Sequence, residues 1–234
     1  MTTKPASQIG SAGQLPRLTW LPDPPVSPDM QEQFPYISRA YVILEDHFRS
    51  RPDVFVGGEG YLCYSPSDIP NAPKPDCMVA TGLEIPPAEI TESNGYAISE
   101  IGKPPDFVLE VASKSTGQRD YTDKRAIYAG YGVVEYWRFD HTGGRYHDAA
   151  LAGDRLVDGI YEPIPTVTGE DGVIRGYSAA LGLELRWYEG GLRFWDPTTG
   201  EYLPELTEAK AQRDAALERV RQLEAELARR QSGG

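Results

Sequence analysis

The sequence lacks several features that define common classes of protein. It has no uninterrupted apolar run of the length that a transmembrane helix needs, which is about 20 residues. Residues 1–20 contain no continuous apolar core, so they do not resemble a signal peptide. Cysteine is scarce, with Cys63 and Cys77 alone, and a chain of 234 residues can bury a core without disulfides. We therefore expect free, buried thiols, a cytoplasmic location and no membrane partner.

Well-known catalytic motifs are also missing. The three histidines are scattered, and neither they nor the cysteines show zinc-ligand spacing. There is no G-x-S-x-G elbow, no phosphate-binding Walker loop and no dinucleotide fingerprint. The Gly-Gly-Glu-Gly stretch at 57–60 is expected to form a turn or a bulge.

Positive charge is in short supply. The chain has 23 Lys and Arg against 35 Asp and Glu, a formal net charge of −12. This balance disfavours broad, nonspecific binding to nucleic acid, which depends on neutralising phosphates with basic side chains. A local basic groove is still compatible with it, and the excess of carboxylates suits a site for a hard cation.

Composition divides the chain into three regions. Residues 1–29, rich in Pro, Gly, Ser and Thr, predict an extended arm. Residues 30–203 carry the apolar segments of one folded domain. Within 204–234, apolar residues spaced by three and four predict an amphipathic or coiled-coil helix over 204–230. About three heptads are marginal for a coiled coil, so a solvated terminal helix and one that forms a homodimer or binds a partner both remain open.

Several elements of the domain follow from its apolar pattern. Residues 30–50 predict a helix that begins after Pro35. Its apolar face should hold Ile37, Tyr41, Leu44 and Phe48. Residues 53–65 predict a strand with a glycine-rich interruption, and 76–85 begin as a short strand. The short runs between 141 and 203, split by Gly and Asp, predict antiparallel hairpins packed on the core.

The stretch Pro105–Ser115 places one carboxylate, Glu110, within an otherwise apolar run. Its sequence, PDFVLEVASKS, predicts a short buried strand. Burying a lone carboxylate is costly unless it is paired or binds a metal. Glu110 therefore either faces solvent or a lysine at the end of the strand, or it serves a metal site.

A helix and a further strand should follow. Ser115 and Gln118 have the spacing of a capping box, which predicts a helix start. Gly130 and Gly132 offer its end, and the β-branched and aromatic residues of 133–140 predict another strand.

A second carboxylate has a matching position. Asp76 follows Pro75 and opens the strand that precedes the one containing Glu110. An Asp at the start of one strand and a Glu inside the next can project toward one point. Two such hard oxygen ligands suit Mg²⁺ or Mn²⁺.

These residues carry a family resemblance. The pattern comprises Pro75-Asp76, Pro105-Asp106, Glu110-Val111, Ser113, Ser115, Asp120, Lys124, Tyr128, Gly132-Val133 and Glu135-Tyr136-Trp137. It resembles the Uma-type restriction endonuclease family of the PD-(D/E)XK nuclease superfamily. The match is dense over 105–140 and thinner over 34–195, and it leaves out the arm and the C-terminal helix.

The resemblance implies an α/β (α+β) fold, in which helices flank a central mixed sheet in the order helix, three strands, helix, strand. It also implies a metal-dependent DNA endonuclease, with Asp76 and Glu110 as ligands of Mg²⁺ or Mn²⁺. Asp106 then marks the beginning of the strand and takes no part in the site.

The chain departs from the superfamily pattern at one position. Ala112 stands where a lysine is expected, two residues after Glu110. Asp120, Lys124 and Tyr128 are four residues apart and share a helical face. Lys124 can therefore replace the missing lysine from the helix, supported by the other two. Alternatively, Asp120 and Lys124 form an ordinary surface ion pair.

Further contacts are expected near the helix start. Residues 113–125 carry net positive charge, and the side chains expected to contact the substrate phosphate are Ser113, Lys114, Ser115 and Arg119. Glu45 on the first helix is a candidate additional metal ligand. The alternative for these residues is a solvated helix face.

Two other functions remain open. The missing lysine and the negative net charge suit a catalytically weak or inactive scaffold that assembles through its C-terminal helix. A nuclease acting on RNA or branched DNA is the other alternative, because function depends on sites and not on the fold.

Overall fold

A computed structural model describes residues 17–26, 29–117, 120–205, 208, 218, 219 and 221. Most of the predicted C-terminal helix and the first sixteen residues of the predicted arm lie outside these ranges. Within the described ranges, no helix combines the length and apolarity needed to cross a membrane.

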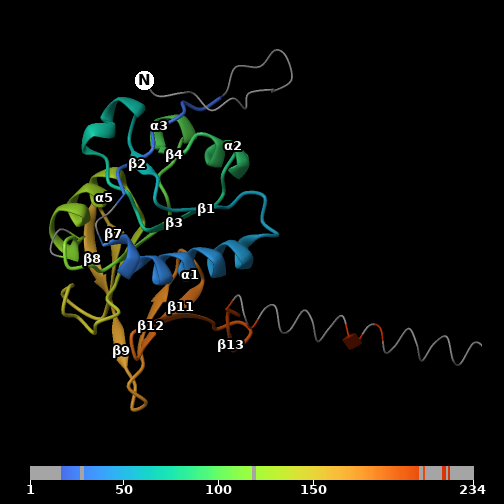
Figure 1. Ribbon diagram of the computed structural model, residues 1–234, viewed down its shortest axis with the longest axis vertical. Helices are drawn as coiled ribbons and strands as arrows, with labels where there is room; N and C mark the ends of the chain where they lie inside the picture. Colours follow the sequence, from blue (N-terminus) through green and yellow to red (C-terminus); the bar gives the residue numbers. More distant parts are fainter. Residues whose placement is uncertain are drawn as a thin grey trace, which may run out of the picture.

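A six-stranded mixed sheet forms the centre of the fold (Figure 1). Its strands, in spatial order, are β1 (Phe55–Gly57), β3 (Cys77–Ala80), β5 (Phe107–Val111), β6 (Glu135–Phe139), β7 (Leu151–Val157) and β8 (Ile160–Ile164). The central pair, β5 and β6, is parallel, and every other neighbouring pair is antiparallel. The parallel pair needs a crossover connection, which the helical segment between the two strands supplies.

A second sheet and several helices surround this centre. The second sheet is antiparallel, in the order β13 (Glu201–Tyr202), β12 (Gly191–Asp196), β11 (Leu183–Tyr188), β10 (Ile174–Ser178) and β9 (Thr166–Thr168). The described helices are α1 (Met30–Phe48), α2 (Pro87–Glu92), α3 (Ile98–Ile101) and α5 (Arg125–Tyr131), with the 3-10 helix η1 (Pro66–Asn71) and the π-helical turn η2 (Asp120–Lys124). Two short strands, β2 (Tyr61–Cys63) and β4 (Gly95–Ala97), pair in parallel.

Strand β5 is buried on both faces, which explains its nearly continuous apolar sequence. Phe107, Leu109 and Val111 pack in the core cluster that contains residues of α1 and of the second sheet. Val108 packs in the other cluster, beside Tyr128 of α5. Because side chains alternate along a strand, Glu110 lies on the Val108 side and faces the α5 side of the sheet.

The predicted fold class is confirmed. Along the chain, α1, β1, β3, β5, α5 and β6 follow the expected order of helix, three strands, helix and strand. The region after 141 forms antiparallel strands, as predicted; β7 and β8 extend the central sheet, and β9–β13 form the second one. Cys63 and Cys77 are free and buried.

Three local expectations were wrong. Helix α1 begins at Met30, before Pro35, because the Asp29 carbonyl accepts the amide hydrogens of Glu32 and Gln33. Tyr41 is 38% exposed and falls off the buried face. The single strand expected over 53–65 is two strands in different sheets, because the glycine-rich turn redirects the chain.

The predicted helix cap at Ser115 stays a prediction. Its hydroxyl donates to Asp29 Oδ2 at 2.5 Å, so it is engaged by a residue distant in sequence. Gln118, the other half of the predicted capping box, lies outside the described residues. The helix end was predicted correctly, since Gly132 adopts a left-handed φ of 82° that favours glycine.

Candidate active site

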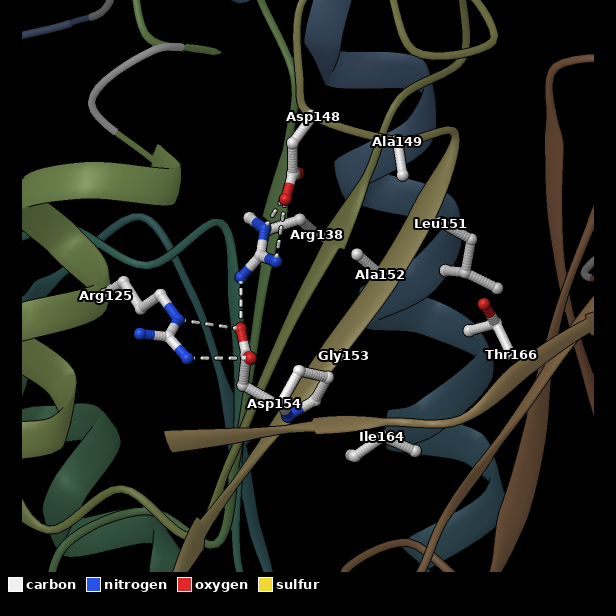
Figure 2. Close-up of a pocket in the computed structure, with 11 residues that line it drawn as sticks. Arg125, Arg138, Asp148, Ala149, Leu151, Ala152, Gly153, Asp154, Ile164 and Thr166 are labelled. Carbon is white, nitrogen blue, oxygen red and sulfur yellow. Dashed lines mark hydrogen bonds and ion pairs between the residues drawn. The ribbon is translucent and has the colours of Figure 1, made fainter. Parts of the chain in front are cut away.

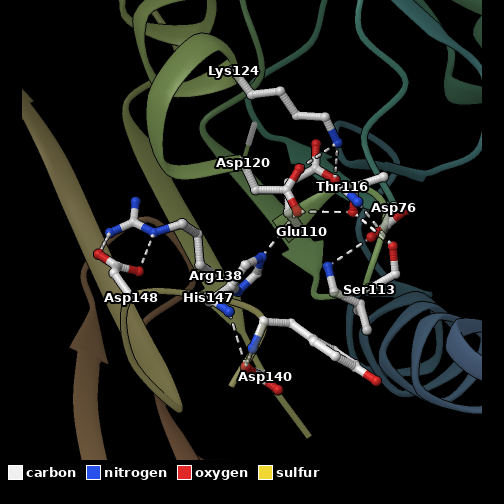
Figure 3. A network of polar contacts seen from close by, with 12 residues as sticks. Asp76, Glu110, Ser113, Thr116, Asp120, Lys124, Arg138, Asp140, His147 and Asp148 are labelled. Atoms are coloured by element: carbon white, nitrogen blue, oxygen red, sulfur yellow. Dashed lines mark hydrogen bonds and ion pairs between the residues drawn. The ribbon is translucent and has the colours of Figure 1, made fainter. Parts of the chain in front are cut away.

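Asp76 and Glu110 lie next to each other across two strands. Cys77 pairs with Leu109 in the antiparallel β3–β5 register, so the same register places Asp76 opposite Glu110. The Val111 amide donates to Asp76 Oδ2 at 2.6 Å, which holds this carboxylate at the end of β5. Both carboxylates are buried, and Figure 3 shows them beside each other in one polar network.

Lys124 reaches this pair from η2. Its Nζ lies 2.7 Å from Glu110 Oε2 and 2.9 Å from Asp120 Oδ1 (Figure 3). The Tyr128 hydroxyl donates to the other oxygen of Glu110 at 2.5 Å. The structure thus brings together the three helical residues that the sequence placed on one face, and it directs two of them at Glu110.

Asp120 has partners on its second oxygen as well. Its Oδ2 lies 2.9 Å from Nε2 of His147 and accepts the Thr116 hydroxyl at 3.1 Å. Both Asp120 and His147 have fully buried side chains. These contacts rule out the alternative of a surface ion pair between Asp120 and Lys124.

The electrostatics of the cluster follow from its burial. Burial, followed by the charge of Glu110, raises the pKa of Asp76 well above its ordinary value. Burial likewise raises the pKa of Glu110, although Lys124 opposes this rise. Burial alone would lower the pKa of Lys124, but the carboxylates of Glu110 and Asp120 raise it. Burial favours a higher pKa for Asp120 too, yet hydrogen bonds from His147 and Lys124 bring it below the usual range.

The donor set of the site is compatible with a hard divalent cation. Among the described residues, no group of three or more His, Cys, Asp and Glu is placed to hold a metal ion. Mg²⁺ does not require such a group, because one or two carboxylates, waters and substrate phosphate oxygens complete its shell. A cation beside Asp76 and Glu110 would offset the repulsion that raises the pKa of Asp76. It would share Glu110 with Lys124 and Tyr128 through the remaining lone pairs.

Three of the four residues expected to contact phosphate lie in the described turn that follows β5. Ser113 is buried, and its hydroxyl is 2.9 Å from that of Thr116. Ser115 gives both its amide hydrogen and its hydroxyl to Asp29, so a carboxylate already occupies these donors. Lys114 is exposed in the same turn. Arg119 lies outside the described residues.

Two other acidic residues lie apart from the cluster. Glu45, the candidate additional ligand, forms an exposed ion pair with Arg49 at 3.6 Å. Asp106 accepts the Thr81 amide hydrogen at 2.7 Å and forms an ion pair with Lys103. These contacts fix the residue that directly precedes β5.

Glu59 is a neighbour of the site that the sequence did not reveal. It adopts a left-handed φ of 59° within the glycine-rich turn, and its amide donates to the Pro75 carbonyl at 2.8 Å. Burial raises the pKa of its partly buried carboxyl group, while Lys74 and a hydrogen bond with Asp76 lower it. The only signal in the sequence was a glutamate flanked by glycines. In the structure its positive φ is uncommon for a non-glycine residue.

Arg138 borders the site on the next strand and lines a cavity of about 410 Å³ (Figure 2). The parallel register places Arg138 beside Glu110. Its guanidinium pairs with Asp154 at 2.6 Å and with Asp148 at 3.2 Å, and Arg125 pairs with Asp154 at 3.0 Å. The charges of these four side chains, which line the cavity, compensate one another, so they leave no excess positive charge to attract a phosphate.

The candidate site places two carboxylates and a lysine together on one face of a mixed sheet. A family model described as "Putative restriction endonuclease", Uma2, matches residues 25–187, which is more than half of the chain. The chain therefore belongs to this family, and the resemblance seen in the sequence is confirmed.

The chain is also similar to a solved structure. This is the crystal structure of "a putative nuclease belonging to DUF820 from Anabaena variabilis ATCC 29413", with 15% sequence identity and a TM-score of 0.39. The match covers 61% of this chain and 70% of that one. A search of curated proteins found no match.

Proposed function

We propose that the protein is a metal-dependent endonuclease that hydrolyses phosphodiester bonds in DNA. The observation that carries the proposal is the position of Asp76 and Glu110, side by side and buried, with the Lys124 ammonium 2.7 Å from Glu110. Membership of the restriction endonuclease family supports the reaction class. The two free, buried cysteines are compatible with the cytoplasmic location that we also propose.

Each residue has a distinct role in this proposal. Asp76 and Glu110 would hold Mg²⁺ or Mn²⁺, and a bound cation would supply an activated water and neutralise phosphate charge. Lys124 places a fixed positive charge where negative charge develops on the phosphate during hydrolysis. Tyr128 orients Glu110 through its 2.5 Å hydrogen bond. Lys124 thus replaces, from the helix, the side chain that Ala112 lacks.

A plasmid-nicking assay tests the proposal. Supercoiled DNA is incubated with the protein and Mn²⁺ or Mg²⁺, with EDTA and the Glu110→Gln variant as controls. We expect cleavage that requires the cation and is lost in the variant. Equal nicking by the variant would assign the activity to a contaminant or to another site. Parallel reactions with single-stranded DNA, branched DNA and RNA define the substrate.

One observation favours the scaffold as a second candidate. Each oxygen of Glu110 already accepts a hydrogen bond, from Lys124 or Tyr128, so only the remaining lone pairs are open to a cation. A scaffold would show no thermal response to Mn²⁺, and its self-association would depend on concentration and be lost on truncation at residue 203. A homodimer through 204–230 is part of this second proposal.

A further inference from the structure

His147 is a buried polar residue for which the sequence offered no role. It lies in the loop between β6 and β7, with a fully buried side chain, and its Nε2 is 2.9 Å from Asp120 Oδ2. An ionised carboxylate only accepts hydrogen bonds, so Nε2 carries the proton. The other ring nitrogen, Nδ1, is buried without a partner among the described residues. Burying a polar group is costly unless it is hydrogen-bonded. The hydrogen bond to Asp120 is therefore the contact that compensates for burying this imidazole.

The backbone around His147 is held firmly against the helix start. Asp140 Oδ2 accepts the amide hydrogens of Tyr146 at 2.7 Å and of His147 at 3.0 Å. The loop also lies directly on Gly117, where an added Cβ would sit 2.0 Å from the Tyr146 carbonyl oxygen. The loop therefore presents His147 to Asp120 from a fixed position.

Asp120 in turn presents its other oxygen to Lys124. Because His147 and Thr116 both occupy Oδ2, the carboxylate cannot rotate without losing hydrogen bonds, and Oδ1 faces Lys124 at 2.9 Å. Lys124 thus lies between Glu110 and Asp120, at 2.7 and 2.9 Å. Figure 3 shows this chain of contacts, which runs from His147 through Asp120 to Lys124 and Glu110.

If a cation bound Glu110, Asp120 would become the main carboxylate that attracts the Lys124 ammonium. A divalent cation on Glu110 repels the Lys124 ammonium and weakens its attraction to that carboxylate. We infer that His147, acting through Asp120, is a positioning residue that keeps Lys124 in the site when Glu110 holds a cation. This inference rests on the function proposed above.

The reactivity of Lys124 toward an amine-acetylating reagent tests the inference without relying on nuclease activity. Mass spectrometry of the whole protein, digested after labelling, gives the acetylation rate of each lysine with and without Mg²⁺. Lys103, whose side chain is 31% exposed, is the internal reference. The variants are His147→Gln, whose amide nitrogen can replace Nε2 as a donor, and His147→Leu, which has no donor.

We expect slow labelling of Lys124 in all three proteins without Mg²⁺, because Glu110 still holds it. With Mg²⁺, labelling stays slow in the wild type and in His147→Gln. In His147→Leu it accelerates at least about tenfold, the effect of losing one hydrogen bond to a charged group. If His147→Leu does not fold, His147→Asn, whose shorter amide does not reach Asp120, takes its place.

Two outcomes overturn the inference alone. One is slow labelling of Lys124 in His147→Leu with Mg²⁺, when the melting temperature of the wild type shows that the cation binds. The other is equal acceleration with and without Mg²⁺, which means that His147 only packs the loop. If Mg²⁺ leaves the melting temperature of the wild type unchanged, the proposed function fails, and the inference fails with it.

Discussion

Lys124, whose side chain is 14% exposed, forms an ion pair of 2.7 Å with the buried Glu110, between η2 and β5. The superfamily pattern that the sequence resembles implies a lysine two residues after the glutamate, where this chain has Ala112. Here the ammonium group that contacts Glu110 comes from the helical turn η2.

Replacing Glu110 by Gln should remove the response to metal. In the wild type, Mn²⁺ at 100 times its dissociation constant should stabilise the fold by about 2.7 kcal/mol. The variant lacks one of the two carboxylates and should show little or no shift in thermal unfolding. Glu45→Gln is the matched control, because Glu45 lies exposed beside Arg49 and should leave the shift intact. A full shift in Glu110→Gln would place the metal elsewhere.

Replacing Lys124 by Met should destabilise the protein strongly. The change leaves Asp76, Glu110 and Asp120 buried together without a compensating cation, and breaking a buried pair typically costs about 3–5 kcal/mol. Urea unfolding at neutral pH measures the free energy. Arg49→Met, which removes a surface ion pair, should have little effect. Unchanged stability in Lys124→Met would mean that the carboxylates are already neutral.

Replacing Asp76 by Asn should stabilise the metal-free protein at neutral pH. The folded-state pKa of Asp76 lies well above its ordinary value, so wild-type stability is lost as pH rises from about 4 through that raised pKa. The amide oxygen of Asn can still accept the Val111 amide hydrogen. The melting temperature of the variant should match the wild type at acidic pH and exceed it at neutral pH.

Each kcal/mol corresponds to about 2–4 °C for a domain of this size. Saturating Mn²⁺ should reverse the order, because only the wild type retains both carboxylates. A variant that is less stable than the wild type at neutral pH without metal would contradict the raised pKa.

Replacing Gly58 by Ala should displace the backbone of Asp76. An added Cβ would lie 2.2 Å from the Asp76 carbonyl oxygen, so the backbone that carries this carboxylate must move. We expect a loss of about 1–3 kcal/mol and a weaker thermal response to Mn²⁺. Gly130→Ala is the control: a Cβ there meets nothing within 4 Å, and alanine favours helix α5. Equal behaviour of the two variants would show that the turn does not support Asp76.

The sequence by itself determined the elements whose physics is local. An apolar run of strand length predicted β5, and a glycine predicted the end of α5. Spacings of four placed Asp120, Lys124 and Tyr128 on one helical face. These properties depend on backbone periodicity and on contacts within one turn of helix. The same local reasoning identified Asp76 and Glu110 as candidates.

Only the tertiary structure decided which partners these side chains meet. His147 contacts Asp120 across 27 residues, and Asp29 takes the donors of Ser115 across 86 residues. Glu59 joins the site because a left-handed turn brings it beside Asp76, and no periodic pattern encodes such a turn. Contacts of this kind depend on how loops pack against the sheet, and packing between distant segments sets the positions of those loops. The sequence therefore determined strand β5 and the helical face, and folding selected which charges lie together.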